Sequence, residues 1–116
     1  MYEYQAEVVR WVDGDTVYLT VDLGFRMSST TSFRLYGIDT PERGRPGAKD
    51  ASARAAELAP AGSEVHIRTH KDPDKYGRWL VEVEIPERFG VTVNEVLVEE
   101  GHAVGYFGGT KGVPVP

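Results

Sequence analysis

Four stretches of the chain alternate hydrophobic with polar residues, which is typical of strands that bury one face. The apolar positions are Val17, Leu19 and Val21; Phe33 and Leu35; Val65, Ile67 and Thr69; and Trp79, Val81, Val83 and Ile85. A shorter apolar run over residues 8–12 ends at Asp13-Gly14, a dipeptide that favours a turn. The sequence therefore predicts about five strands, at 8–12, 17–21, 33–38, 65–70 and 79–85.

Two further segments have helical character. The first has an apolar stripe at Ala51, Ala55, Leu58 and Ala59. This spacing predicts a helix over 51–59, with Asp50 as its cap. The second begins with a capping box from Thr92 to Glu95 and ends at Gly101. Both helices follow strands, one after the third strand and the other after the fifth.

The polar stretch Gly24–Thr31 shows no alternation, so we expect a long exposed hairpin loop there. Residues 108–116 contain glycines and prolines without periodicity, which indicates a flexible tail. A chain of 116 residues suits one compact domain, which we assign to residues 1–107. The order of elements predicts a mainly β, α+β fold: a five-stranded barrel of the OB type with two packed helices.

Composition narrows the class of protein. The chain has 41% hydrophobic and 27% charged residues, no cysteine and a net charge of −5. These values indicate a soluble globular protein without disulfides or thiolate metal sites. No apolar run of about 18 residues and no signal-like start are present, so we expect a cytoplasmic protein without a membrane partner. The negative charge argues against tight sequence-independent nucleic-acid binding, but it allows a small site that engages a few phosphates.

Candidate chemistry begins with three acidic residues near predicted strand ends. Asp15 follows the first turn, and Asp39 and Glu42 flank the end of the third strand. If these strands are neighbours, the three carboxylates converge at one rim of the barrel. Carboxylates about 5 Å apart repel by about 3 kcal/mol at an effective dielectric constant of about 20, so a cation would favour the cluster. Oxygen ligands alone suit Ca²⁺ or Mg²⁺ better than zinc. Alternatively, Asp-Gly is only a turn and Asp39 only a cap.

Two arginines lie beside the same predicted strands. A planar guanidinium grips phosphate through two parallel hydrogen bonds, which lysine cannot do. Arg34 and Arg78 could therefore hold a phosphodiester and stabilise charge that builds up during its cleavage. The alternative for each arginine is an ordinary surface salt bridge.

Together, three segments give a more specific indication than their parts. They are Asp13–Thr16 (Asp-Gly-Asp-Thr), Arg34–Glu42 (Arg-Leu-Tyr-Gly-Ile-Asp-Thr-Pro-Glu) and Asp74–Arg78 (Asp-Lys-Tyr-Gly-Arg). In composition and order they resemble the staphylococcal nuclease (thermonuclease) family. Residues 93–98, followed by Gly101, also resemble the second helix of that family. The resemblance extends over nearly the whole predicted domain, from about Val8 to Tyr106.

The resemblance implies a Ca²⁺-dependent phosphodiesterase that acts on DNA or RNA, preferably single-stranded or frayed, as a monomer. By this resemblance, Asp15 and Asp39 ligate Ca²⁺ through their side chains and Thr40 through its carbonyl, with Asp13 in a supporting position. The implied catalytic residues are Glu42, which orients or deprotonates water, and Arg34 and Arg78, which clamp the phosphate. The implied substrate contacts are Lys75, Tyr76 and Tyr106.

The chain departs from the family pattern at its periphery. Residues 24–31 form an apparent insertion that either contacts substrate or is simply tolerated. The loop after Glu42 looks shorter, yet it keeps Arg43, Arg45 and Lys49 as a possible basic patch. Beyond Tyr106 we expect the third helix of the family to be absent. Two other functions stay open: a non-catalytic OB module that binds nucleic acid or protein, and a structural calcium site without a substrate.

Overall fold

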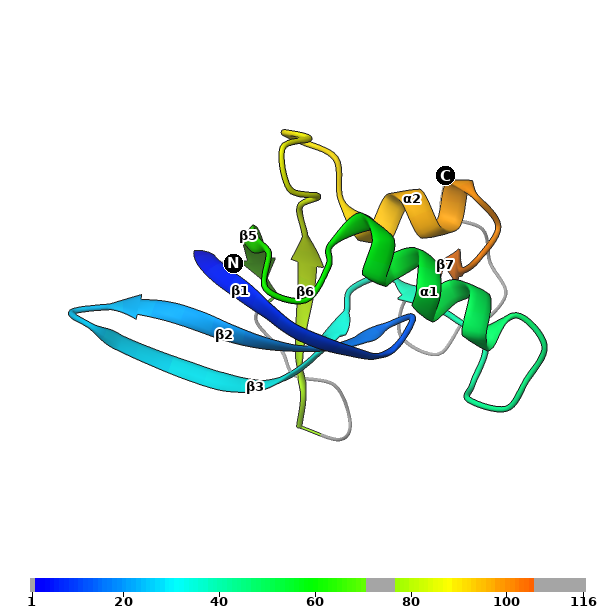
Figure 1. Ribbon diagram of the computed structural model, residues 1–116, viewed down its shortest axis with the longest axis horizontal. Coiled ribbons are helices and arrows are strands. Elements are labelled where there is room, and N and C mark those ends of the chain that lie inside the picture. The colour runs from blue at the N-terminus through cyan, green and yellow to red at the C-terminus, as the bar shows by residue number, and fades with distance from the viewer. Residues whose placement is uncertain (1, 71–76, 106–116) are drawn as a thin grey trace.

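The computed structural model describes residues 2–70 and 77–105 (Figure 1). Its elements in chain order are β1 (Tyr2–Asp13), β2 (Thr16–Gly24), β3 (Met27–Leu35), β4 (Ile38–Asp39), α1 (Ala48–Leu58), β5 (Glu64–Thr69), β6 (Trp79–Val83), α2 (Val93–Glu99) and β7 (Val104–Gly105). Five of these strands close into a barrel in the order β1-β2-β3-β6-β5. The predicted mainly β fold with a five-stranded barrel and two helices is confirmed.

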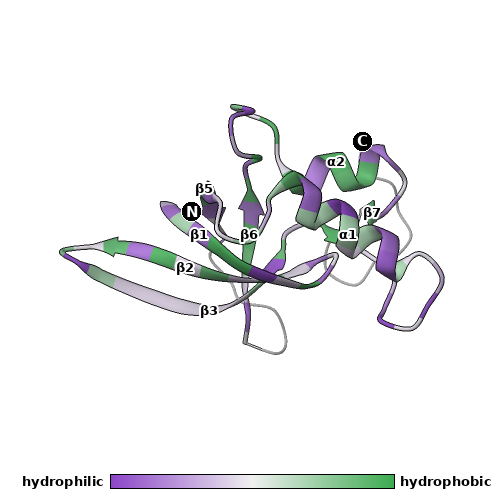
Figure 2. Ribbon diagram, in the orientation of Figure 1, coloured by the Kyte–Doolittle hydropathy of each residue, from purple (hydrophilic) through white to green (hydrophobic). Residues whose placement is uncertain are grey.

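The barrel closes because β5 pairs with both β1 and β6. All neighbours are antiparallel except β3 and β6, which run parallel. The alternating apolar residues point inward, and Val8, Leu19, Leu35, Ile67 and Val83 have no exposed surface. Burial of this one face of each strand is the main force that holds the barrel together. Figure 2 shows the resulting mixture of hydrophobic and hydrophilic colours along the strands.

The two helices start differently from each other. α1 begins after Gly47, whose φ of 88° is left-handed, and it has no side-chain cap. The prediction that Asp50 caps this helix is therefore wrong, since Asp50 lies in the first turn. There its negative charge still favours the positive end of the helix dipole. The capping box of α2 is confirmed, because the Thr92 side chain accepts the Glu95 N–H and the Glu95 side chain accepts the Thr92 N–H.

The segment predicted as a long hairpin loop is instead mostly strand. β2 continues to Gly24 and β3 starts at Met27, so Phe25 and Arg26 form a two-residue turn. The cross-strand backbone hydrogen bonds do not depend on side-chain alternation, which explains why the polar sequence concealed them. The exposure predicted for residues 24–31 is confirmed. β2 and β3 thus form a two-stranded ribbon that projects from the barrel (Figure 1).

Two short strands, β4 and β7, pair beside the barrel and fix the chain where Asp39 and Thr40 lie. Neither helix of the described chain has the length and apolar character needed to cross a bilayer. The predicted flexible tail at 108–116 and the predicted absence of a third helix lie outside the described residues. The division into a domain at 1–107 and a tail therefore stays a prediction.

Candidate active site

The turn between β1 and β2 brings Asp15 against α1 and the end of β4. A side-chain carbon built at Gly14 would lie 2.8 Å from Ala51 Cβ and 3.0 Å from Thr40 Cγ2. Only glycine therefore permits this approach without displacing its neighbours. Asp15 follows directly and is buried, with 6% of its surface exposed. The Asp-Gly dipeptide thus forms more than a turn, because it positions a carboxylate inside the structure.

Arg34, on β3, bridges the two aspartates that sequence analysis singled out. Its Nη1 lies 3.2 Å from Asp15 Oδ2, and its Nη2 lies 3.0 Å from Asp39 Oδ1. Nη2 also donates to the Ile38 carbonyl at 3.1 Å. The three charged side chains are 9–18% exposed, which makes their pairing important, since a buried charge without a partner is costly. The two carboxylates and one guanidinium leave a formal charge of −1 at this rim.

Thr40 links the same two segments through its backbone. Its N–H donates to Asp15 Oδ2 at 3.2 Å. Its side-chain hydroxyl is buried and has no hydrogen-bond partner among the described residues. Buried hydroxyls normally have hydrogen-bond partners, so this oxygen is an exception among the described residues.

Arg78 reaches this rim from the segment that precedes β6. Its Nη1 donates to Thr16 Oγ1 at 3.2 Å, and that hydroxyl lies 3.4 Å from Asp15 Oδ1. Thr16 pairs with Arg34 in the register of β2 and β3. Sequence analysis did not single out Thr16, although its position after Asp15 and opposite Arg34 connects the two arginines to the same carboxylate.

Asp13 and Glu42 lie at the edge of this group. Arg43 Nε is 3.5 Å from Asp13 Oδ1, and Arg43 Nη2 donates to the Val12 carbonyl at 3.4 Å. Sequence analysis gave Arg43 only a possible place in a basic patch. Glu42 is exposed, and its carbonyl accepts the Arg45 N–H at 2.9 Å in a turn. Arg43 therefore attaches the loop that carries Glu42 to the end of β1.

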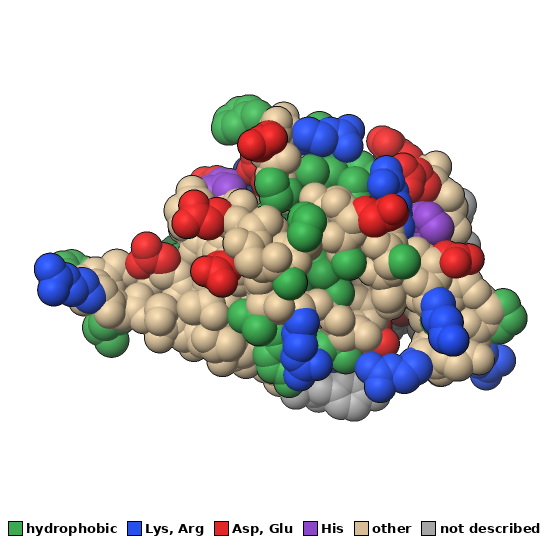
Figure 3. Space-filling model, in the orientation of Figure 1, with side chains coloured by type: hydrophobic (Ala, Val, Ile, Leu, Met, Phe, Trp, Pro, Cys, Tyr) green, Lys and Arg blue, Asp and Glu red, His purple; other side chains and the backbone are tan. Residues whose placement is uncertain are grey.

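Basic side chains are common near this loop. Arg43, Arg45 and Lys49 are all exposed. Figure 3 shows Lys and Arg side chains gathered at the end of the molecule where this loop precedes α1. Lys75, Tyr76 and Tyr106, which sequence analysis assigned to substrate binding, lie outside the described residues.

The donor atoms at the rim suit a hard cation. Asp15 and Asp39 offer carboxylate oxygens, and Thr40, whose backbone N–H donates to Asp15, has a backbone carbonyl oxygen. Nitrogen and sulfur ligands, which favour zinc and copper, are not among these donors. In the part of the chain that the structure describes, no set of three or more His, Cys, Asp or Glu side chains is arranged to hold a metal. A cation here would therefore depend on two side-chain carboxylates and on backbone oxygen.

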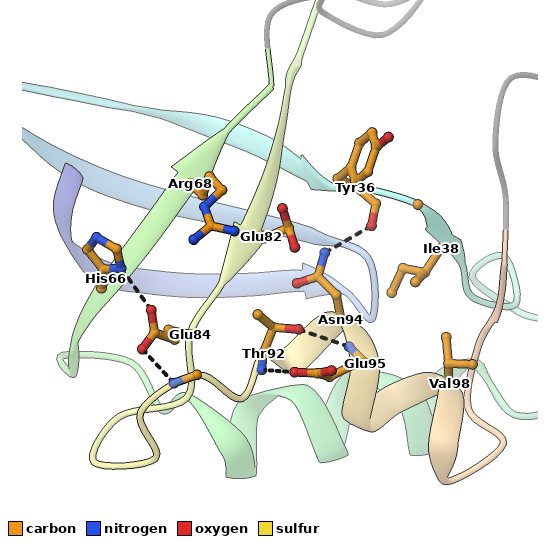
Figure 4. A pocket seen from close by; sticks show the side chains of 12 residues that line it. Tyr36, Ile38, His66, Arg68, Glu82, Glu84, Thr92, Asn94, Glu95 and Val98 are labelled. Carbon is orange, nitrogen blue, oxygen red and sulfur yellow. Dashed lines mark hydrogen bonds and ion pairs between the residues drawn. The ribbon is translucent and has the colours of Figure 1, made fainter. Parts of the chain in front are cut away.

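A separate concave pocket of about 390 Å³ lies between β5, β6 and α2 (Figure 4). Asp15, Asp39, Arg34 and Arg78 do not line it, although Ile38, whose carbonyl accepts Arg34 Nη2, does. Its polar residues are paired internally: His66 Nδ1 lies 2.8 Å from Glu84, and Asn94 donates to the Tyr36 carbonyl at 3.0 Å. Close by, His70 pairs with Glu82 at 2.9 Å. These histidines therefore take part in glutamate pairs on the outside of the barrel.

Comparison with known proteins adds independent information. Residues 32–112 match the family described as staphylococcal nuclease homologue. The chain is 36% identical over 110 residues to micrococcal nuclease of Shigella flexneri and 35% identical over 115 residues to protein ParB of Escherichia coli. It is 32% identical over 118 residues to endonuclease YhcR of Bacillus subtilis (strain 168). Each match covers 90% of this chain, but only 59%, 58% and 9% of the respective relatives.

Proposed function

This chain belongs to the family of staphylococcal nuclease homologues, and from that premise we propose that it hydrolyses phosphodiester bonds of DNA or RNA with the aid of Ca²⁺. At the coarser level it is a nuclease-like domain. The observation that carries the proposal is the convergence of Asp15, Asp39, Arg34 and Arg78 at one rim of the barrel. Two acids and two planar cations in this arrangement match the needs of phosphate cleavage.

The acids would provide the metal site. We assign Ca²⁺ to the side chains of Asp15 and Asp39 and the carbonyl of Thr40, with other positions open to water and substrate. When bound, Ca²⁺ would polarise a phosphate oxygen and help to orient the attacking water. Asp13 would act indirectly, because its partner Arg43 belongs to the loop that carries Glu42.

The remaining residues would handle the phosphate and the water. Arg34 and Arg78 would donate hydrogen bonds to the phosphate oxygens and stabilise the negative charge that grows in the transition state. Glu42 is exposed to solvent, so its carboxylate can orient a water molecule and accept its proton. We further assign Lys75 and Tyr76 to a terminal phosphate and Tyr106 to the sugar and base. A single-stranded or frayed substrate would reach such a rim more easily than an intact duplex.

A digestion assay tests this proposal. Single-stranded DNA is incubated with the wild-type protein in Ca²⁺ or in excess chelator, and with the Glu42→Ala and Arg78→Ala variants. We expect cutting only with Ca²⁺ and a loss of about 10²-fold or more in kcat/KM for each variant. Glu57→Ala and Arg88→Ala, which change exposed residues elsewhere, serve as matched controls and should cut normally.

Two results would contradict the mechanism. Cutting that persists in chelator would contradict the requirement for Ca²⁺. Full activity of Glu42→Ala and Arg78→Ala would contradict the roles assigned to Glu42 at the water and to Arg78 at the phosphate. Affinity for single-stranded DNA without any turnover in Ca²⁺ would favour the non-catalytic binding module instead.

A further inference from the structure

The ribbon of β2 and β3 extends farther than the barrel requires. β1 pairs with β2 only as far as Val21, and β6 pairs with β3 only from Phe33 onward. We call residues 22–32 the arm; among the described residues, their strand partners all lie within β2 and β3. All arm residues but Ser32 are exposed. The arm contributes little to the core, so its length calls for an explanation outside the core.

One face of the arm continues directly from Arg34. Residues directly opposite in an antiparallel pair share a face, and every second residue repeats it. The pairs on the Arg34 face are Thr16–Arg34, Tyr18–Ser32, Thr20–Thr30 and Asp22–Ser28. The hydroxyls of Thr20 and Thr30 are 2.7 Å apart. A row of hydroxyl groups thus leads from the candidate active site along the ribbon, and pale weakly polar colours mark this part of β3 in Figure 2.

The charge of the ribbon differs from that of the whole chain. Residues 16–34 contain one acid and two arginines, a net charge of +1, whereas the chain carries −5. The acid, Asp22, accepts the N–H of Gly24 at 2.8 Å. On β1, Arg10 adds a cation, since its guanidinium lies 4.5 Å from the centre of the Tyr18 ring, and Glu7 opposite Thr20 adds an acid, so the two together leave the charge of +1 unchanged. A polyanion is therefore repelled less along this ribbon than by the chain on average.

The tip has side chains that its turn does not need. Phe25 and Arg26 have φ values of 54° and 61°, a conformation that costs an ordinary L-residue about 1–2 kcal/mol. Asn-Gly is the favoured pair for such a turn. Phe25 is 97% exposed, and Leu23 and Met27 beside it are 45% and 62% exposed. Figure 3 shows a basic side chain next to hydrophobic ones at the projecting end of the molecule.

We propose that the arm is a second nucleic-acid contact, which holds a single strand that also occupies the cleavage site. This inference rests on the proposed function. Hydroxyl groups of Ser, Thr and Tyr are common donors to phosphate and sugar oxygens. Exposed aromatic side chains stack on unpaired bases. The row from Tyr18 to Ser28 therefore contacts the sugar–phosphate backbone, and Phe25 stacks on a base while Arg26 contacts a phosphate.

The length of the arm determines how many nucleotides a substrate needs to contact both the arm and the cleavage site. Eight residues separate Arg34 from Arg26 along β3, which is about 27 Å in an extended strand. At about 3.4 Å per stacked nucleotide, this distance corresponds to about eight nucleotides. A dinucleotide would reach only the cleavage site, whereas a strand of twelve nucleotides would reach both.

The test compares these two substrates in a variant whose arm is expected to fold at least as well. Phe25→Asn combined with Arg26→Gly gives the favoured turn sequence and removes both proposed contacts. We expect an equal or higher Tm, unchanged cleavage of a dinucleotide, and a KM for a twelve-nucleotide thymidine strand raised at least fivefold. Phe89→Ser is the matched control, since Phe89 is 98% exposed on another loop, and its KM should stay at the wild-type value.

Different results would contradict the arm proposal and the proposed function. An unchanged KM for the long strand, with dinucleotide cleavage intact, would overturn the arm proposal and leave the proposed function standing. If the wild-type protein cleaves neither substrate, the proposed function fails. The arm is then judged by fluorescence anisotropy with the labelled twelve-nucleotide strand: weaker binding of the arm variant supports the arm, and equal binding overturns it.

Discussion

At the scale of single residues, the sequence motifs identify the residue types of the candidate site but not how their side chains contact one another. The acids and arginines stand out in the sequence because hard cations and phosphates need these residue types. Their mutual arrangement does not stand out, because it follows from the register that sets Thr16 opposite Arg34. Arg34 was expected to grip phosphate, yet it also bridges Asp15 and Asp39. A guanidinium presents five N–H donors, so the bridge to the two aspartates is compatible with the proposed contact to phosphate.

Gly14 gives the first residue-scale prediction. Because a methyl group there would lie 2.8 Å from Ala51 Cβ, Gly14→Ala must push the turn away from α1 and from Thr40. We expect a loss of stability of about 1–3 kcal/mol, typical of overpacking, and a loss of kcat/KM of tenfold or more since Asp15 moves with the turn. Thermal unfolding and the digestion assay measure the two effects. Ala53→Ser, at an exposed position of α1, is the control, and wild-type behaviour of Gly14→Ala would refute this role.

At the scale of elements, the sequence predicted strands well where one face is buried. The alternation of Val17, Leu19 and Val21 follows directly from the barrel interior. The arm lacks this alternation because neither of its faces meets a core, and it is held extended mainly by backbone pairing between β2 and β3. The start of α1 was predicted wrongly because backbone conformation, not a side chain, sets it. Gly47 precedes the helix with a left-handed backbone, whereas Asp50, a residue type common at caps, lies inside the first turn.

The loop between β6 and α2 gives a pH prediction. Glu84 accepts the Gly90 N–H at 2.9 Å and pairs with His66, and these contacts hold the pKa of Glu84 below the ordinary glutamate value of 4.5. A lowered pKa in the folded state means that ionised Glu84 stabilises the fold above about pH 4.5. That stability is lost as the pH falls through the lowered pKa.

Glu84→Gln keeps the shape of this side chain and removes its charge. We expect the free energy of unfolding at pH 7 to fall by at most about 1 kcal/mol, which lowers Tm by a few degrees. The effect is small because solvent partly screens the pair of Glu84 and His66. The Tm values of variant and wild type should converge as the pH falls through the lowered pKa of Glu84, below which the side chain is protonated in both the folded and the unfolded state. Glu87→Gln, on the same loop and exposed, should unfold like the wild type at every pH. A Tm difference between Glu84→Gln and the wild type that does not shrink as the pH is lowered would show that the charge of Glu84 is not the cause.

At the scale of the whole molecule, the proposed function requires an acidic chain to engage a polyanion. The net charge of −5 repels nucleic acid in general, while basic side chains gather near the loop after Glu42 and a further one lies at the tip of the ribbon. A bound cation would further offset Asp15 and Asp39. Sequence composition alone could not locate these basic regions, because their position depends on how the barrel brings distant segments together.

A metal that neutralises this rim should also stabilise the whole fold. A ligand that binds only the folded state adds about 2.7 kcal/mol at one hundred times its Kd, which raises Tm by on the order of 10 °C in a domain of this size. We therefore expect Ca²⁺ to raise the Tm of the wild-type protein and to have little effect on Asp39→Asn, while Asp22→Asn, far out on the arm, responds like the wild type. Since the measurement needs no substrate, it separates the metal site from catalysis. A Tm that is insensitive to Ca²⁺ would contradict the proposed metal site. Stabilisation by Ca²⁺ without cleavage of nucleic acid would favour a purely structural cation.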